Sequence, residues 1–296
     1  MKAPNAVGII SMFYARPFGP AHLSLFPRMK AAGMDFVELL VPEEGELDLA
    51  RTRAALSEAG LGVALAARVN LQRDLASADA PAHRAGIAYL KRCVDVAVEL
   101  GATLVGGPLY GAPLVFAGRP PAPVDEPTRA ARIERIVAGL KDAAGYAASR
   151  GVVFGLEPLN RFETDIANTT RHGLAIVEAV DSPALGVMLD TFHMNMEDPD
   201  IAAALRRAGD RLVHFQANEN DRGFVGSGHI DWPAVAKALA HIGYRGPITL
   251  EPFRRDDERP GVPLAQWRAP ARDYDAELSA SAAFLRATLD AAWRTR

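Results

Sequence analysis

The stretch VVFGLEP, residues 152–158, decides the fold: a short apolar run ends in a glutamate, and a proline closes it. Later runs share this form, an apolar segment followed by a side chain that could bind a metal: Leu185–Leu189 before Asp190, Leu212–Phe215 before Gln216, and Ile248–Leu250 before Glu251. Each run has the length and composition of a buried parallel strand, and a helix-like segment follows it. In a closed β/α barrel the carboxyl ends of such strands meet in one crater, so these side chains should converge.

Strand-like and helix-like segments alternate along the whole chain. The strand candidates are Val7–Met12, Phe36–Val41, Val63–Val69, Thr103–Gly106, Val152–Leu156, Gly186–Leu189, Leu212–Phe215 and Ile248–Leu250. Glycines stand between helical patterns and the next strand, where a left-handed residue is favoured; they are Gly33, Gly60, Gly101, Gly151, Gly209 and Gly243. Asp125 and Pro127 begin the helix before the fifth strand in the expected order.

This count of units, with no Gly/Ser linker between them, predicts one α/β domain over residues 1–296. The expected architecture is a single (β/α)8 TIM barrel, a closed parallel sheet with outer helices, ending in a helix at about 274–295. The structural rival is a doubly wound open sheet. Against it, no Gly-x-Gly-x-x-Gly follows the first strand, where the chain reads MFYARP over residues 12–17.

Composition limits the range of functions. The net charge is 33 − 36 = −3, which gives no electrostatic reason to bind nucleic acid. The only cysteine, Cys93, sits in an apolar helical pattern and is expected to be a buried thiol, and no intrachain disulfide can form. No apolar stretch approaches the length of a membrane span, and the first residues do not resemble a secretory signal. We therefore expect a cytoplasmic protein with neither a nucleic acid nor a membrane as partner.

Glu157, Asp190, Gln216 and Glu251 together make a set of metal ligands. Three converging carboxylates repel one another, and a divalent cation is the simplest remedy. In the seventh strand, alternation places His214 and Gln216 on the inward face, with Gln216 closer to the crater. Gln216 is favoured as the fourth ligand and His214 as a hydrogen-bonded core residue, although both remain open. The oxygen ligands favour Mn²⁺ or Mg²⁺ over Zn²⁺, and Co²⁺ is also compatible.

Asp190 has a second interpretation, as the cap of a following helix. The pattern places the start of that helix near Asp198 or Pro199, too far along the chain. We therefore interpret Asp190 as a ligand and not as a cap.

Four segments carry a resemblance to a known family. They are Glu157–Glu163 (EPLNRFE), Leu189–Asn195 (LDTFHMN), Glu219–Gly223 (ENDRG) and Glu251–Phe253 (EPF). The chain resembles, over nearly its whole length, the ketose 3-epimerases of the D-tagatose and D-psicose 3-epimerase group. That group belongs to the xylose-isomerase-like barrel superfamily of sugar isomerases and epimerases.

The resemblance implies metal ligands at Glu157, Asp190, Gln216 and Glu251. It implies substrate contacts at Glu163, His193 and Arg222. There is one departure, because typical epimerases have histidine at the position of Gln216. Hydroxypyruvate isomerases of the same superfamily carry glutamine there.

The implied activity is metal-dependent epimerisation of free ketohexoses or ketopentoses at C3. Inverting C3 requires a proton to leave one face and arrive at the other, so two carboxylates are needed, and Glu157 and Glu251 are the candidates. The intermediate is an enediolate, which a cation on the sugar oxygens stabilises. An apolar wall of Phe13, Tyr110, Leu114 and Phe116 is expected at the sugar's far end. The resemblance also implies a homo-oligomer, a dimer or tetramer.

Several rivals remain. Gln216 favours an aldose–ketose isomerase of the hydroxypyruvate type. A keto-inositol dehydratase is a third candidate enzyme function. A DNA-repair endonuclease on the same barrel would need a histidine-rich zinc site and a basic groove, and neither is evident in the sequence. A non-catalytic sugar-binding protein would not need both glutamates.

Overall fold

The computed structural model describes residues 2–113, 123–254 and 273–296. Within these ranges parallel strands close into a barrel in sequence order, which confirms the predicted TIM barrel. The strands are β1 (Val7–Ile10), β2 (Phe36–Leu40), β3 (Gly62–Ala66), β4 (Leu104–Gly107), β5 (Val153–Leu156), β6 (Leu185–Asp190), β7 (Leu212–Ala217) and β8 (Ile248–Leu250).

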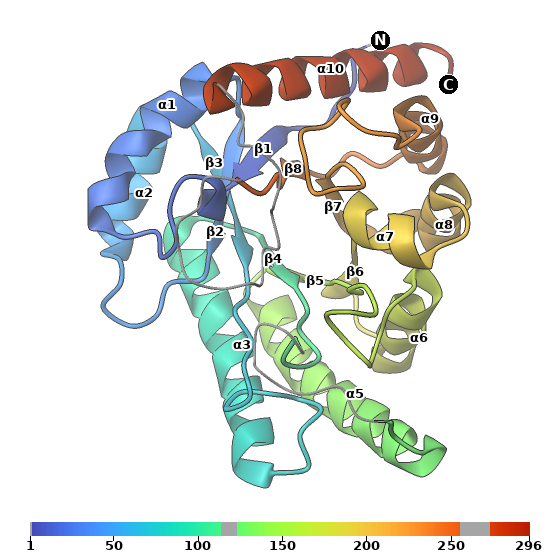
Figure 1. The fold of residues 1–296 in the computed structure, drawn as a ribbon. Coiled ribbons are helices and arrows are strands. Elements are labelled where there is room, and N and C mark those ends of the chain that lie inside the picture. The colour runs from blue at the N-terminus through green and yellow to red at the C-terminus, as the bar shows by residue number, and fades with distance from the viewer. Residues whose placement is uncertain (1, 114–122, 255–272) are drawn as a thin grey trace.

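Helices surround the barrel (Figure 1). They are α1 (Phe26–Ala31), α2 (Leu49–Ala59), α3 (Ala80–Leu100), α5 (Glu126–Ser149), α6 (Thr170–Val180), α7 (Thr191–Glu197), α8 (Ile201–Ala208), α9 (Trp232–Ile242) and α10 (Tyr274–Arg294). Short 3-10 turns, η1 (Ser11–Phe13), η2 (Pro20–Leu25) and η3 (Gly209–Arg211), join some of them to the strands. The two chain ends lie near each other, and the Ala3 amide donates to Asp290 Oδ1 of α10 at 2.7 Å.

Side-chain caps explain where many of the helices begin. A preceding aspartate accepts from a backbone N–H of the first turn at α2, α3, α5, α8, α9 and α10; the caps are Asp48, Asp79, Asp125, Asp200, Asp231 and Asp273. Each such cap contributes about 1 kcal/mol. Gly60, Gly101 and Gly243 end α2, α3 and α9 in the left-handed conformation, as the sequence predicted.

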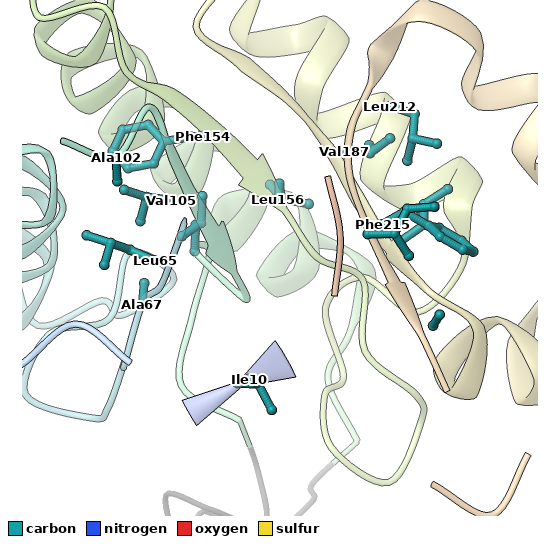
Figure 2. Close-up of a cluster of buried hydrophobic side chains, with 14 of the residues drawn as sticks. Ile10, Leu65, Ala67, Ala102, Val105, Phe154, Leu156, Val187, Leu212 and Phe215 are labelled. Carbon is teal, nitrogen blue, oxygen red and sulfur yellow. The ribbon is translucent and has the colours of Figure 1, made fainter. Parts of the chain in front are cut away.

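The outward faces of the strands form the core beneath the helices (Figure 2). Leu65, Val105 and Phe154 are neighbours in register on β3, β4 and β5, and all are fully buried. Burial of such a side chain contributes about 2 to 3 kcal/mol. On the inward face Gly106 leaves the room that Met188 occupies, since a Cβ there would collide with the Met188 sulfur.

Two strand ends differ from the predicted ones in ways that affect the cavity. β3 ends at Ala66, whereas the apolar pattern ran on to Val69, so Arg68 lies in the loop after the strand. The Arg68 amide there bonds the Tyr89 hydroxyl at 2.6 Å instead of a neighbouring strand. β7 continues to Ala217, so Gln216 lies within the sheet. Among the helices of the described ranges, none combines the length and the apolar character needed to cross a lipid bilayer.

Candidate metal and substrate site

The four side chains predicted to converge do lie at the same end of the barrel. Glu157 follows β5, Asp190 ends β6, Gln216 lies in β7 and Glu251 follows β8. Each is at most 6% exposed. A cavity of about 370 Å³ opens here, and its lining includes Glu157, Gln216 and Glu251 together with the predicted substrate residues Glu163, His193 and Arg222. The structure therefore brings together the residues that the sequence singled out.

Asp190 corrects one sequence interpretation, because it does cap a helix. α7 begins at Thr191, directly after the strand, and the Phe192 amide donates to Asp190 Oδ1 at 2.8 Å. The Asn218 side chain donates to the same oxygen at 2.9 Å. Oδ2 has no hydrogen-bond partner in the described part of the chain and lies 3.4 Å from Arg222 Nη2. One oxygen thus fixes the helix start while the other faces the site, so capping and ligation do not exclude each other.

Gln216 is held by a residue that the sequence analysis did not single out. Its Nε2 donates to Glu38 Oε1 of β2 at 3.3 Å, across the barrel interior. Its Oε1 is buried and has no hydrogen-bond partner among the described residues. Because an amide has one acceptor oxygen, anchoring the nitrogen turns that oxygen toward the cavity.

His214 occupies the deeper layer that alternation predicted. It pairs with Met188 of β6, whereas Gln216 pairs with Asp190 one step nearer the crater. The His214 Nε2 lies 2.8 Å from Glu38 Oε2 and 3.3 Å from Thr249 Oγ1, and the residue is fully buried. His214 is thus a hydrogen-bonded core residue in this structure, with Glu38 joining it to Gln216.

His193 is fixed in a neutral form. The Asn160 amide donates to its Nδ1 at 3.0 Å. Burial, followed by the nearby Arg222 charge, holds the pKa of His193 well below its usual range. A backbone N–H can only donate, so Nδ1 accepts here, while the Arg222 Nη1 lies 3.2 Å from the other ring nitrogen, Nε2. That nitrogen lies 3.6 Å from Glu157 Oε1 and 3.7 Å from Asp190 Oδ2.

Glu163 reaches His193 through Asn160. The Asn160 side-chain nitrogen donates to Glu163 Oε1 at 2.8 Å and lies 2.9 Å from His193 Nδ1. Asn160 is 2% exposed. The resemblance implied a substrate contact at Glu163, and in the structure its carboxylate is joined to His193 through Asn160.

Arg222 enters the site in a strained conformation. It has φ 58°, unusual for a residue with a side chain, and its amide donates to Glu219 O at 3.0 Å. Its guanidinium lies between two rings, 4.6 Å from the centroid of Phe192 and 4.4 Å from that of Phe253. Its Nη2 donates to Glu251 Oε2 at 2.7 Å. The rings and the carboxylate together fix its direction.

The turn that carries Arg222 is built on a second buried acid. Glu219 is fully buried, and its carboxylate accepts from Trp232 Nε1 at 2.6 Å, Gly226 N at 2.8 Å and Ile230 N at 3.3 Å. These bonds tie the loop after β7 to the start of α9. The arrangement holds Arg222 above the cavity.

Burial raises the pKa of the carboxylates of the site, and the neighbouring negative charges act in the same direction. Burial, followed by the charges of Glu251 and Asp190, raises the pKa of Glu157 well above its ordinary value. Burial raises the pKa of Glu251 to about 8, although Arg222 acts in the opposite direction. Burial would lower the pKa of Arg222, but Glu251 and Asp190 beside it keep that pKa above its usual value. Without a further positive charge these acids resist full ionisation.

The residues present fit a divalent cation. Glu157, Asp190 and His193 offer ligand atoms within 4.8 Å of one another, so this buried group could hold a metal ion. Asp190 Oδ2 and Gln216 Oε1 are buried oxygens without a hydrogen-bond partner in the described chain. A cation would satisfy both oxygens and offset the crowded negative charge.

Sequence reasoning missed Glu38, Asn160, Asn218 and Glu219 as parts of the site. Glu38 had a visible signal, a lone charge within the apolar strand run FVELL, residues 36–40. Asn218 shares the inward alternation of Gln216. The roles of Asn160 and Glu219 depend on hydrogen bonds to loop backbone, which a sequence pattern does not show.

The expected apolar wall is not where the sequence placed it. Phe13 is 2% exposed and packs on Tyr14, Phe224 and Tyr274, outside the cavity lining. Tyr110 is fully buried, and its hydroxyl donates to Ala167 O at 3.3 Å. Leu114 and Phe116 lie outside the described residues. The prediction was wrong for Phe13 and Tyr110, because large aromatic rings were needed in the packing beneath the loops.

The closed barrel, with a buried acidic crater at the carboxyl end of its strands, defines a TIM-barrel protein with a candidate metal site. The chain belongs to the Xylose isomerase-like TIM barrel family, whose model matches residues 26–287.

Among proteins of known activity, the chain is 34% identical to the ketose 3-epimerase of Arthrobacter globiformis, over 89% of each protein. It is also 34% identical to the L-ribulose 3-epimerase of Methylomonas sp. (strain DH-1), over 82% of this chain and 83% of that protein. These similarities confirm the resemblance to the ketose 3-epimerases and place the chain among isomerase-class enzymes.

Solved structures of 3-epimerases show the same similarity at the level of the fold. A structure of L-ribulose 3-epimerase superposes with a TM-score of 0.89 at 30% identity, covering 98% of this chain and 96% of that one. D-psicose 3-epimerase with D-tagatose, from Clostridium cellulolyticum H10, gives a TM-score of 0.87 at 28% identity, covering 96% and 99%.

Proposed function

We propose that this protein epimerises ketoses at C3 with the help of a divalent cation. The observation that carries the proposal is that Glu157 and Glu251 line the same buried cavity. They come from β5 and β8, with β6 and β7 between them, so the two acids approach a bound sugar from different directions. The epimerase relatives supply the reaction class.

The two glutamates would divide the proton transfer. One takes the C3 proton from one face of the ketose, and the other returns a proton to the opposite face. Their roles exchange when the other epimer binds. In the cation-free protein burial raises the pKa of both carboxyls, so each can be held in the protonated form from which it returns a proton.

Glu157, Asp190, Gln216 and Glu251 would hold the cation, with Mn²⁺ preferred and Mg²⁺ or Co²⁺ as alternatives. The carboxylate and amide oxygens favour hard cations. When bound, such a cation supplies Lewis-acid polarisation of the substrate carbonyl. His193 lies beside Glu157 and Asp190, but Arg222 Nη1 already lies 3.2 Å from its Nε2, so we assign His193 to the substrate and not to the cation.

His193 and Arg222 would instead bind the substrate. The Nε2 of His193 lies among the acids and beside Arg222 Nη1, where it could form a hydrogen bond with a substrate hydroxyl. Arg222, clamped by Phe192 and Phe253, presents a fixed positive charge to the developing enediolate. Glu163 would fix Asn160, and through it His193.

Deuterium exchange tests the proposal. The Mn²⁺-loaded protein is incubated with D-fructose in deuterated water, and the label is located by NMR. Label at C3, together with the C3 epimer, supports epimerisation. Label at C1 with an aldose product supports the hydroxypyruvate-type isomerase that Gln216 favours, and loss of water from a keto-inositol supports a dehydratase. If D-fructose binds but no deuterium enters it, the result supports a non-catalytic sugar-binding protein.

A further inference from the structure

Polar side chains on the loops after β2 and β3 line the side of the cavity away from the acidic site. They are Glu43, Arg68, Asn70 and Arg73. The proposed function places C3 of the ketose between Glu157 and Glu251, which follow β5 and β8. The carbons from C4 to C6 form the longer of the two arms that leave C3. That arm is therefore the part of a bound ketohexose that extends toward this polar wall.

Glu43 and Arg73 form a closed ion pair in the wall. Both terminal nitrogens of Arg73 donate to the Glu43 carboxylate. These hydrogen bonds are the main reason that the pKa of Glu43 lies below its ordinary value, so the carboxylate stays ionised. A carboxylate offers about four acceptor positions, of which the pair uses two. Glu43 can therefore still accept a hydrogen bond from a ligand.

Arg68 joins a second ion pair to the first. Its Nη2 donates to Glu46 Oε2 and lies 3.6 Å from Glu43 Oε1. The two arginines of this network are thus balanced by two glutamates. Arg16, which also lines the cavity, interacts electrostatically with Glu251. The described residues of the wall therefore supply polar groups without an excess of positive charge.

Tyr89 holds the network in place. Its ring centroid lies 3.8 Å from Cζ of Arg73, and its hydroxyl accepts from the Arg68 amide at 2.6 Å. The Nε of Arg73 donates to Arg68 O at 2.8 Å. Three of the five N–H groups of Arg73 are thereby engaged, and the other two have no hydrogen-bond partner among the described residues. Arg73 thus offers donors, and Glu43 an acceptor, at fixed positions.

Asn70 adds a donor beside this pair. Its Oδ1 accepts from the Gln72 amide at 3.0 Å, which leaves the side-chain nitrogen for a ligand. A sugar hydroxyl both donates and accepts, so it can bond Glu43 and, at the same time, Arg73 or Asn70. A methyl group can do neither. A phosphate dianion has acceptor oxygens only, and it would meet Glu43 with like charge.

We propose that the network of Glu43, Glu46, Arg68 and Arg73, together with Asn70, binds the hydroxyl groups at the C6 end of the ketose. It would select an uncharged ketohexose over its 6-deoxy and 6-phosphorylated analogues. The inference rests on the proposed function, whose substrate class it narrows. Discrimination is expected because an analogue without the hydroxyl leaves polar groups of the wall unpaired.

Turnover of matched sugars tests the subsite. The kcat/KM of the Mn²⁺-loaded protein is compared for D-fructose, 6-deoxy-D-fructose and D-fructose 6-phosphate, which differ at C6 alone. We expect D-fructose to exceed each analogue at least about tenfold. Glu43→Ala removes the acceptor and one negative charge, so both preferences should fall about tenfold. The ring forms of the three sugars differ in population, but this difference cancels when the parent and the variant are compared.

Two further variants complete the test. Glu134→Ala, at an exposed position outside the cavity lining, should leave both preferences unchanged. Asn70→Ala keeps the ion pairs and should lower the preference over 6-deoxy-D-fructose, which tests the subsite if Glu43→Ala does not fold. Circular dichroism establishes the folding of each variant.

The outcomes separate the subsite from the proposed function. If D-fructose is epimerised but either analogue has an equal or higher kcat/KM, the inference is overturned and the proposed function stands. Preferences that survive in folded Glu43→Ala and Asn70→Ala overturn it as well. Absence of exchange with all three ketoses contradicts the proposed function, and calorimetry then decides the subsite. Binding of 6-deoxy-D-fructose about tenfold weaker than that of D-fructose supports it, whereas equal affinity or no binding overturns it.

Discussion

The Nε2 of Gln216 lies 3.3 Å from Oε1 of Glu38, so a carboxylate on β2 sets the orientation of an amide on β7 across the barrel. The other oxygen of Glu38 lies 2.8 Å from His214 Nε2. With its nitrogen engaged, Gln216 presents its oxygen to the cavity. Gln216 is therefore held in one defined orientation, with its Oε1 free of hydrogen bonds in the described part of the chain.

Replacing Glu38 should weaken cation binding without touching a ligand. In Glu38→Gln the new amide can offer a donor to Gln216, so the Gln216 amide can turn over and direct its nitrogen at the site. Loss of an orienting partner of this kind typically lowers metal affinity about 10- to 100-fold. Titration calorimetry with Mn²⁺ measures the change. Glu134→Gln, at an exposed position on α5, is the matched control. An unchanged Mn²⁺ affinity in a folded Glu38→Gln variant would contradict the orienting role.

Asp190 caps α7 with one oxygen and faces the proposed cation site with the other. Asp190→Asn and Asp190→Ala should therefore differ in stability, while both should weaken Mn²⁺ binding. Asparagine at this position keeps an oxygen that caps α7, whereas alanine removes it. Asp190→Ala should therefore be about 1 kcal/mol less stable than Asp190→Asn in urea denaturation of the cation-free protein. Both variants lose the carboxylate charge, so both should bind Mn²⁺ more weakly than the parent. Equal stability of the two variants would show that the cap has no energetic role.

The stability of the cation-free protein should fall as the pH rises from about 5 to 8. The pKa of Glu251 is raised to about 8 in the folded chain, above its ordinary value of 4.5. Between those values the folded state binds more protons than the unfolded state. The stabilisation is complete below the unfolded pKa and is lost as the pH passes through the folded one, at up to about 1.4 kcal/mol per pH unit.

Denaturation curves across this range measure the slope. Glu251→Gln should reduce the slope without abolishing it, because the amide does not titrate whereas Glu157, whose pKa is also raised, still does. Mn²⁺ should stabilise the protein more at pH 8 than at pH 6, since binding requires the ionised carboxylates. If the stability of the cation-free protein does not change between about pH 5 and pH 8, the raised pKa of Glu251 is contradicted.

The sequence predicted the barrel because every strand is a short, nearly uniform apolar run and breakers separate the units. It predicted that Glu157, Asp190, Gln216 and Glu251 converge, because parallel strands of a barrel share one carboxyl end. It did not predict that Asp190 caps α7, because the helical pattern after it is short and its first residues face the cavity. It did not identify Glu38 as part of the site, because the partners of a buried carboxylate lie on strands far away in the chain.

Loop positions were the least predictable. Phe13 and Tyr110 were assigned to the substrate wall from their place after strands, yet both are buried in packing. Arg68 was assigned to a strand interior, and it lies in a loop beside the cavity. Periodicity fixes which face of a strand a residue occupies, but it does not describe the path of an irregular loop.

Glu219 should act on catalysis through Arg222. Its carboxylate accepts from Trp232 Nε1, Gly226 N and Ile230 N, which keeps the loop after β7 in the conformation that gives Arg222 its φ of 58°. In Glu219→Gln, an amide nitrogen meets N–H donors, which costs about 1 to 3 kcal/mol of stability. The loop can then relax, and Arg222 loses its fixed direction.

We expect kcat/KM for the ketose to fall at least about tenfold in Glu219→Gln at a temperature where the protein stays folded, with Mn²⁺ affinity nearly unchanged. Trp232→Phe removes one donor and keeps most of the packing, so its effect should be smaller and in the same direction. Circular dichroism establishes that both variants are folded. If folded Glu219→Gln retains the parental kcat/KM, the buried acid stabilises the loop only, and the position of Arg222 depends instead on its two flanking rings and on Glu251.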